Sequence, residues 1–100
     1  MSVHIEQDCK YVGDDYWRWR AWIEGPDQDL DQIDHVVYIL HPTFRNPVRV
    51  VKDRSSKFQL KTAGWGIFEL QAQVVYKNGN QTRLTHDLEL KYPDGTPTTA

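Results

Sequence analysis

The amino-acid sequence predicts an all-β fold, and three observations carry this prediction. Apolar and polar residues alternate in steps of two along most of the chain, which is the period of a half-buried strand. Turn residues interrupt this alternation at short intervals. No stretch keeps a helical period, and one turn of helix near residues 30–33 is the most that the pattern allows. The 100 residues suit one domain with a single core.

Three strands are expected in the first half of the chain. Residues 2–12 alternate apolar and charged side chains, so that one face of this strand is apolar. Residues 17–25 do the same, and here we expect Trp19 in the core and Trp17, near the start of the strand, partly exposed. Residues 33–40 are apolar on both faces toward their end, which is typical of a central strand.

Four more strand candidates follow in the second half. Short apolar segments lie at residues 49–51 and 57–60, and longer alternating segments lie at 67–76 and 83–92. The sequence Lys-Asn-Gly-Asn at 77–80 predicts a tight hairpin between the last two, because Asn and Gly tolerate positive φ. Together, these segments fit an immunoglobulin-like antiparallel β-sandwich of seven or eight strands.

We expect residues 1–92 to form this sandwich and residues 93–100, which are rich in Pro, Gly and Thr, to be a C-terminal linker stub. The single cysteine excludes an internal disulfide and favours a reducing compartment. No segment approaches the length of a membrane span, and no signal peptide is visible, so we expect an intracellular, cytoplasmic domain. A net charge of −2 argues against nucleic acid as the main partner.

The sequence does not predict catalysis. Cys9 lies on the apolar face of the first strand, where a buried thiol is inert. No histidine pairs with another histidine or with the cysteine at a metal-ligand spacing. Asp27, Asp29 and Asp31 resemble the start of a calcium loop, but Tyr38 stands where such a loop has its glutamate. We therefore predict no enzyme activity and no cofactor, and we retain calcium binding by this acidic loop as a lesser alternative.

Two loops collect aromatic residues, at residues 40–44 (Leu-His-Pro-Thr-Phe) and 63–68 (Ala-Gly-Trp-Gly-Ile-Phe). On spacing alone, Phe44 and Phe68 close the end of the core and Trp65 covers them. If both loops meet at one end of the sandwich, the same rings form a slot. Exposed tryptophans on a β-sandwich also suit a carbohydrate-binding module, which is a second lesser alternative.

The order of these motifs resembles the YEATS domain family. The similarity runs through the segments IEGPDQ, IDHVVYILHPTF, PVRVVKD, FQLKTAGWGIFELQAQVVY and LTHDLELKY, from about Trp17 to Tyr92. Its most specific part is His-x-Thr-Phe followed by Gly-Trp-Gly-x-Phe. The TAGW segment and the short N-terminal part look more like the prokaryotic branch of the family.

This resemblance implies an eight-stranded immunoglobulin-like sandwich that reads acylated lysine, such as acetyl- or crotonyl-lysine, at one end. Phe44 and Trp65 would form the two walls of the slot, and Phe68 its floor. Thr43 would hydrogen-bond the acyl amide, and the backbone N–H of Trp65 would donate to the acyl carbonyl. His41 would contact the lysine stem.

The resemblance assigns roles to three further kinds of position. Gly64 and Gly66 would keep the backbone bare so that the ligand can approach. The family often carries another aromatic residue before its second strand, and here either Tyr16 or Trp17 would line the pocket. The resemblance to the prokaryotic branch also implies an alternative, a protein–protein interaction or sensing module of a multidomain bacterial protein that does not bind acyl-lysine.

Overall fold

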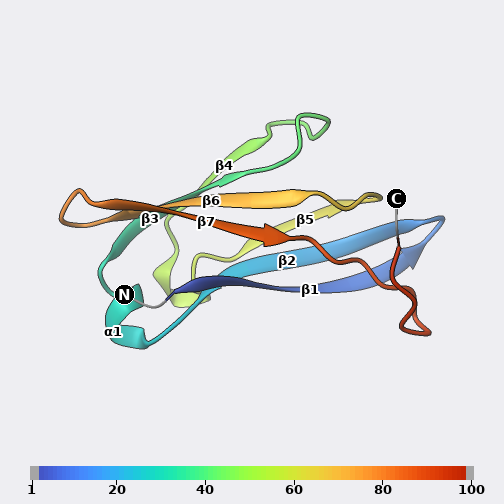
Figure 1. Cartoon of the computed structure of the whole chain (residues 1–100), viewed down its shortest axis with the longest axis horizontal. Helices are drawn as coiled ribbons and strands as arrows, with labels where there is room; N and C mark the ends of the chain where they lie inside the picture. The colour runs from blue at the N-terminus through green and yellow to red at the C-terminus, as the bar shows by residue number, and fades with distance from the viewer. Residues whose placement is uncertain (1–2, 99–100) are drawn as a thin grey trace.

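The alternating segments of the sequence form two antiparallel sheets packed face to face (Figure 1). A computed structural model of the chain describes residues 3–98. The first sheet has the strand order β1-β2-β5 and the second has the order β4-β3-β6-β7. The strands are β1 (His4–Gly13), β2 (Tyr16–Glu24), β3 (Ile33–Ile39), β4 (Val48–Val51), β5 (Leu60–Gly64), β6 (Glu69–Tyr76) and β7 (Gln81–Asp87). The predicted immunoglobulin-like sandwich is confirmed, with seven strands in the described part of the chain.

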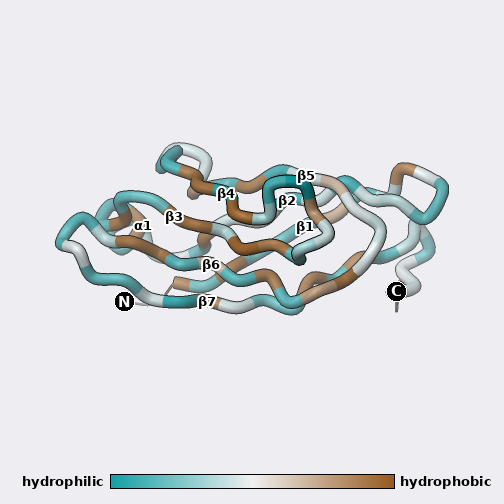
Figure 2. The backbone as a smooth tube through the Cα atoms, turned by 90° about the horizontal axis from the view of Figure 1, so that it is seen from above, coloured by the Kyte–Doolittle hydropathy of each residue, from teal (hydrophilic) through white to brown (hydrophobic). Residues whose placement is uncertain are grey.

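The core lies between the two sheets and is built from the inward-facing residues of each strand. Along β6, hydrophobic and hydrophilic residues alternate (Figure 2), and Leu70 and Val74 are among its buried residues. Trp19 on β2 is buried as predicted. Tyr38 on β3 is also buried, and its hydroxyl donates a hydrogen bond of 2.6 Å to the carbonyl oxygen of Phe58. This bond replaces the hydrogen bond to water that the hydroxyl loses when it is buried in the core.

Residues 57–59 of the segment 57–60, which was expected to be a strand, form a tight turn instead, and Leu60 is the first residue of β5. The turn follows the short 3₁₀ helix η1 (Arg54–Ser56). Lys57 and Phe58 both have positive φ, at 59° and 57°, and the Phe58 side chain is fully buried. The prediction of a strand was wrong for residues 57–59, because positive φ at two successive residues does not fit the extended backbone of a strand.

The hairpin at 77–80 joins β6 to β7 as predicted, but through a different turn. Only Gly79 has a positive φ, at 89°, and the N–H of Gly79 donates to the carbonyl of Tyr76. The backbone of Asn78 does not adopt the left-handed conformation. Its side-chain oxygen accepts a hydrogen bond from the N–H of Asn80. This is the three-residue loop that closes with a left-handed glycine. The helix α1 (Asp27–Leu30) lies slightly earlier than the expected turn of helix.

Beyond β7, the chain continues against the core and then folds back on itself. Leu88 and Leu90 are buried. The N–H of Tyr92 donates to the carbonyl of Thr96, and the N–H of Thr98 donates to the carbonyl of Leu90. Of the expected linker stub at 93–100, residues 99 and 100 lie outside the described part of the chain. Among residues 3–98, no helix is long and apolar enough to cross a membrane.

Candidate functional site

A cavity of about 440 Å³ opens at one end of the sandwich, where the loop between β3 and β4 meets the loop between β5 and β6. Its volume lies within the usual range for small-molecule sites. The structure brings together in this cavity every residue that the sequence placed in the slot, except Trp17. The residues that meet here are Tyr16, His41, Thr43, Phe44, Gly64, Trp65, Gly66 and Phe68.

Phe44 forms a fixed inner wall of the cavity. Its ring centroid lies 5.4 Å from that of Phe68 and 6.4 Å from that of Trp19, in tilted and edge-to-face arrangements. The ring also lies close to Gly64: a Cβ atom built at this position would be only 3.3 Å from Phe44 Cζ. The absence of a side chain at Gly64 therefore lets the ring lie close against β5.

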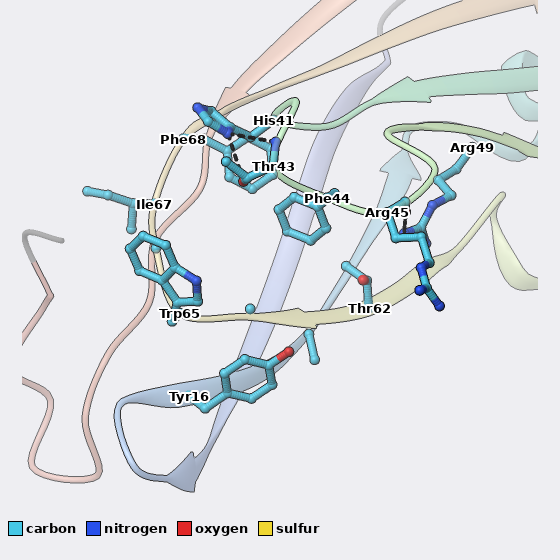
Figure 3. A pocket seen from close by; sticks show the side chains of 13 residues that line it. Tyr16, His41, Thr43, Phe44, Arg45, Arg49, Thr62, Trp65, Ile67 and Phe68 are labelled. Carbon is cyan, nitrogen blue, oxygen red and sulfur yellow. Dashed lines mark hydrogen bonds between the residues drawn. The ribbon is translucent and has the colours of Figure 1, made fainter.

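Trp65 presents its indole to the cavity from the loop after β5. It is 62% exposed, which makes it the most exposed of the large hydrophobic residues in the described part of the chain. Figure 3 shows the rings of Trp65, Phe44 and Tyr16 set apart around the cavity, each from a different segment. Trp65 thus leaves the cavity open and does not fill it, so the sequence-based alternative in which it covers the end of the core does not describe this structure.

His41 and Thr43 form a local hydrogen-bonded pair at the cavity. The backbone N–H of Thr43 donates to His41 Nδ1 at 3.2 Å, and Thr43 Oγ1 lies 2.9 Å from the same nitrogen. A nitrogen that accepts an N–H carries no proton, so this geometry assigns the imidazole proton to Nε2. The Thr43 hydroxyl therefore donates to Nδ1, and its oxygen retains lone pairs that can accept a hydrogen bond from a ligand.

Tyr16, and not Trp17, is the aromatic residue of β2 that lines the cavity. Trp17 is fully buried, and its Nε1–H donates to the carbonyl of Lys91 at 2.8 Å. Its ring packs against Tyr11 and Tyr92, with centroids 5.0 Å and 5.1 Å away. The expectation of a partly exposed Trp17 was therefore wrong.

The turn between β1 and β2 explains this exchange. Gly13, Asp14 and Asp15 all have positive φ, and the strand register shifts between Tyr11 and Gly13. Successive side chains of a strand point to opposite faces of the sheet. The register set by the turn therefore decides which of the two neighbouring rings, Tyr16 or Trp17, faces the core. Here Trp17 faces the core and Tyr16 faces the cavity.

Sequence reasoning missed part of the cavity lining. Arg45, Arg49, Thr62, Ala63 and Ile67 also line it. The proximity of the two arginines to the His-x-Thr-Phe motif was the only signal available. Thr62 stands two residues before Gly64, and so on the same face of β5, but the sequence does not show that this face reaches the cavity.

The acidic loop expected as an alternative metal site already holds an arginine. Arg54 Nε lies 2.9 Å from a carboxylate oxygen of Asp31, and Arg54 Nη2 lies 3.3 Å from one of Asp27. Among residues 3–98, no group of three His, Cys, Asp or Glu side chains is placed to hold a metal ion. A guanidinium satisfies the carboxylates that a calcium ion would need.

Comparison with known proteins gives concordant results. The model of the prokaryotic YEATS domain family matches residues 17–89. Transcription initiation factor TFIID subunit 14 of Schizosaccharomyces pombe is 39% identical over 69 residues, which are 68% of this chain and 28% of that protein. A protein AF-9 homolog of Eremothecium gossypii is 36% identical over 77 residues, 72% of this chain and 36% of that protein. The chain thus spans about a third of the length of these relatives.

Solved structures show the same fold. A structure of the Yaf9 YEATS domain recognizing an H3K122suc peptide superposes with a TM-score of 0.74 at 27% identity, covering 92% of this chain and 72% of that one. The yeast AF-9 homolog protein Yaf9 superposes with a TM-score of 0.75 at 25% identity, covering 92% of this chain and 68% of that one.

Proposed function

Because this chain belongs to the prokaryotic YEATS domain family, we propose that it is a non-catalytic module that recognises acylated lysine in the cavity at the end of its sandwich. The observation that carries the proposal is the pairing of aromatic walls with one free hydrogen-bond acceptor. Phe44 and Trp65 offer flat apolar surfaces, and Thr43 Oγ1 lies at the same cavity with lone pairs to spare.

An acylated lysine matches this chemistry better than a free lysine does. Acylation removes the ammonium charge and leaves a planar amide with one N–H and one carbonyl. The amide N–H can donate to Thr43, while the plane of the group lies against the aromatic rings. A free ammonium would lose its hydration among these rings, and it has no carbonyl to accept a hydrogen bond from the N–H of Trp65.

The remaining residues have supporting roles in this proposal. Tyr16 adds a third ring at the cavity, and Phe68 forms its floor behind His41, whose ring centroid is 6.3 Å from that of Phe68. His41 orients the Thr43 hydroxyl and contacts the lysine stem. Gly66 leaves the backbone after Trp65 accessible, so that the N–H of Trp65 can donate to the acyl carbonyl.

The solved neighbours support the choice of ligand class. The Yaf9 YEATS domain, which shares the fold at 27% identity, recognizes an acylated histone peptide. The proposed ligand of this chain is the acyl-lysine itself, whatever the peptide sequence around it.

The test is an NMR titration of the domain with peptides of one sequence that carry acetyl-lysine, crotonyl-lysine or unmodified lysine. We expect shift changes confined to residues 41–44 and 64–68 with the acylated peptides and none with the unmodified one. A domain that remains unperturbed by the acylated peptides at millimolar concentration would show the proposal to be incorrect.

Thr43 offers a matched pair of variants. Thr43→Val keeps the shape of the side chain but removes the acceptor, and we expect it to weaken acetyl-lysine binding by about three- to tenfold, the value of one hydrogen bond. Thr43→Ser keeps the hydroxyl and should bind nearly as well as the parent. Equal loss in both variants would assign the effect to packing and not to the hydrogen bond.

A second function, protein contact without acyl-lysine binding, is favoured by one observation. Val48 and Val50 are 58% and 55% exposed on β4, which is an edge strand of its sheet. Unpaired edges with apolar side chains suit strand addition by a partner. If this function holds, Val50→Lys would abolish partner binding and Thr43→Val would leave it intact.

A further inference from the structure

One side of the cavity carries two arginines and a threonine, whose N–H and O–H groups can donate hydrogen bonds to a further group of the ligand. Figure 3 shows His41 on one side of Phe44, and Arg45, Arg49 and Thr62 on the other. All of these residues line the same cavity. This inference rests on the proposed function, because it concerns what lies next to the acyl amide when Thr43 binds it.

The two arginines carry charges that the protein itself does not neutralise. Among residues 3–98, neither Arg45 nor Arg49 forms an ion pair, whereas Arg20 pairs with Asp8 and Arg54 pairs with Asp27 and Asp31. Arginine without a carboxylate partner at a cavity is suited to bind an anion, because its fork of N–H groups matches a carboxylate.

Arg49 is also held in place. Its Nε donates to the carbonyl of Asn46 at 2.6 Å, and its Nη2 donates to the carbonyl of Arg45 at 2.9 Å. These bonds hold the guanidinium against the loop that carries Phe44, and within residues 3–98 no hydrogen bond engages its Nη1. A charge that is positioned before binding loses less side-chain freedom when the ligand arrives.

We propose that Arg45, Arg49 and Thr62 form a subsite for a carboxylate of the ligand next to the acyl-lysine slot. The positive charges and the N–H and O–H groups all favour an oxygen anion. They also oppose a basic flanking sequence, because like charges at a shared surface repel. The carboxylate has two sources, the end of a dicarboxylic acyl group on the lysine or an acidic side chain beside the acyl-lysine.

The experiment measures dissociation constants by fluorescence polarisation with pairs of peptides that differ only in charge. The first pair carries succinyl-lysine or its neutral terminal amide, succinamyl-lysine, which has the same length. The second pair carries acetyl-lysine flanked by Glu or by Gln. We expect the charged member of at least one pair to bind about fivefold tighter or more, as charge-assisted hydrogen bonds do. The pair that shows the preference identifies the source of the carboxylate.

Variants connect the preference to the subsite. Arg45→Gln, and Arg45→Gln combined with Arg49→Gln, should reduce the preference stepwise to no more than about twofold. Arg83→Gln is the matched control, because Arg83 is an exposed arginine of β7 that does not line the cavity, and it should leave the preference unchanged.

The outcomes separate this inference from the proposed function. If acetyl-lysine binds but both charged peptides bind no better than their neutral partners, the carboxylate subsite is disproved and acyl-lysine recognition stands. If a preference exists but survives in the double arginine variant, the assignment to Arg45 and Arg49 is wrong. If no acylated peptide binds at all, both proposals fail.

Discussion

The ring of Phe44 lies against the backbone of Gly64, so that a methyl group on Gly64 would be 3.3 Å from Phe44 Cζ. This contact joins a loop of one sheet to a strand of the other, because Phe44 precedes β4 and Gly64 ends β5. It sets the position of the inner wall of the cavity. The width of the slot therefore depends on Gly64 having no side chain.

Gly64→Ala should narrow the slot by moving Phe44. Gly64 does not have a positive φ, so alanine meets no backbone strain there, and the cost is the displacement of the ring by a few tenths of an ångström. We expect a loss of about 1 kcal/mol or less in the free energy of unfolding, at the low end for added core volume, and about five- to tenfold weaker acetyl-lysine binding. Urea denaturation and peptide titration measure the two effects. Unchanged affinity would show that the Phe44 wall does not define the slot.

Trp65→Ala should weaken ligand binding and leave the stability of the fold nearly unchanged, whereas a core substitution lowers stability as well. Because Trp65 is 62% exposed, its removal should change the free energy of unfolding by no more than about 0.5 kcal/mol. Acetyl-lysine binding should fall by tenfold or more, on the order of the contribution of an aromatic contact. Phe44→Ala is the comparison, since Phe44 packs on Trp19 and Phe68 and its loss should lower both quantities. A large loss of stability in Trp65→Ala would contradict the open slot.

Two buried tryptophans on β2 provide an internal comparison of hydrogen bonding. Trp17 Nε1–H donates to the carbonyl of Lys91, whereas Trp19 Nε1–H has no hydrogen-bond partner within residues 3–98. Replacement of either residue by Phe removes a similar volume from the core. Trp17→Phe should therefore destabilise the domain by about 1 kcal/mol more than Trp19→Phe, which is the usual net value of a hydrogen bond. Equal unfolding midpoints for the two variants would contradict this assignment.

The domain should lose stability at alkaline pH, and Tyr38 should be a main cause. Burial raises the pKa of Tyr38 well above its ordinary value near 10, and burial also raises the pKa of Tyr76. The unfolded chain ionises these tyrosines near pH 10, while the folded domain keeps them neutral. Their contribution to stability is thus complete below about pH 10 and is lost progressively as the pH rises above it, because the unfolded state then releases protons first.

Urea denaturation between pH 8 and pH 11 measures this loss. Tyr38→Phe is the control variant, and it should flatten the alkaline slope by up to about 1.4 kcal/mol per pH unit, the value for one proton. It should also lower stability at neutral pH by about 1 kcal/mol, because the bond to the Phe58 carbonyl is lost. A slope that is the same in both proteins would assign the alkaline loss to other groups.

The sequence by itself determined the class of fold and the two halves of the cavity. Alternation in steps of two predicts a strand and its buried face wherever one side of the strand meets the core, as it does for Trp19 and for Leu70. The aromatic loops around Phe44 and Trp65 were recognisable because their motifs are local, with each residue close to its partner in the chain. Such features depend on neighbours in sequence, so the sequence alone reveals them.

Only the tertiary structure decided which ring of β2 faces the cavity and which charges share it. The left-handed turn before Tyr16 sets the register of β2 and so places Trp17 in the core. Arg49 on β4 and Thr62 on β5 belong to different sheets, and they line one cavity because the two sheets pack face to face. The physical reason is that side-chain direction follows from local backbone geometry, whereas contact between distant segments follows from how the sheets bury their apolar faces against each other.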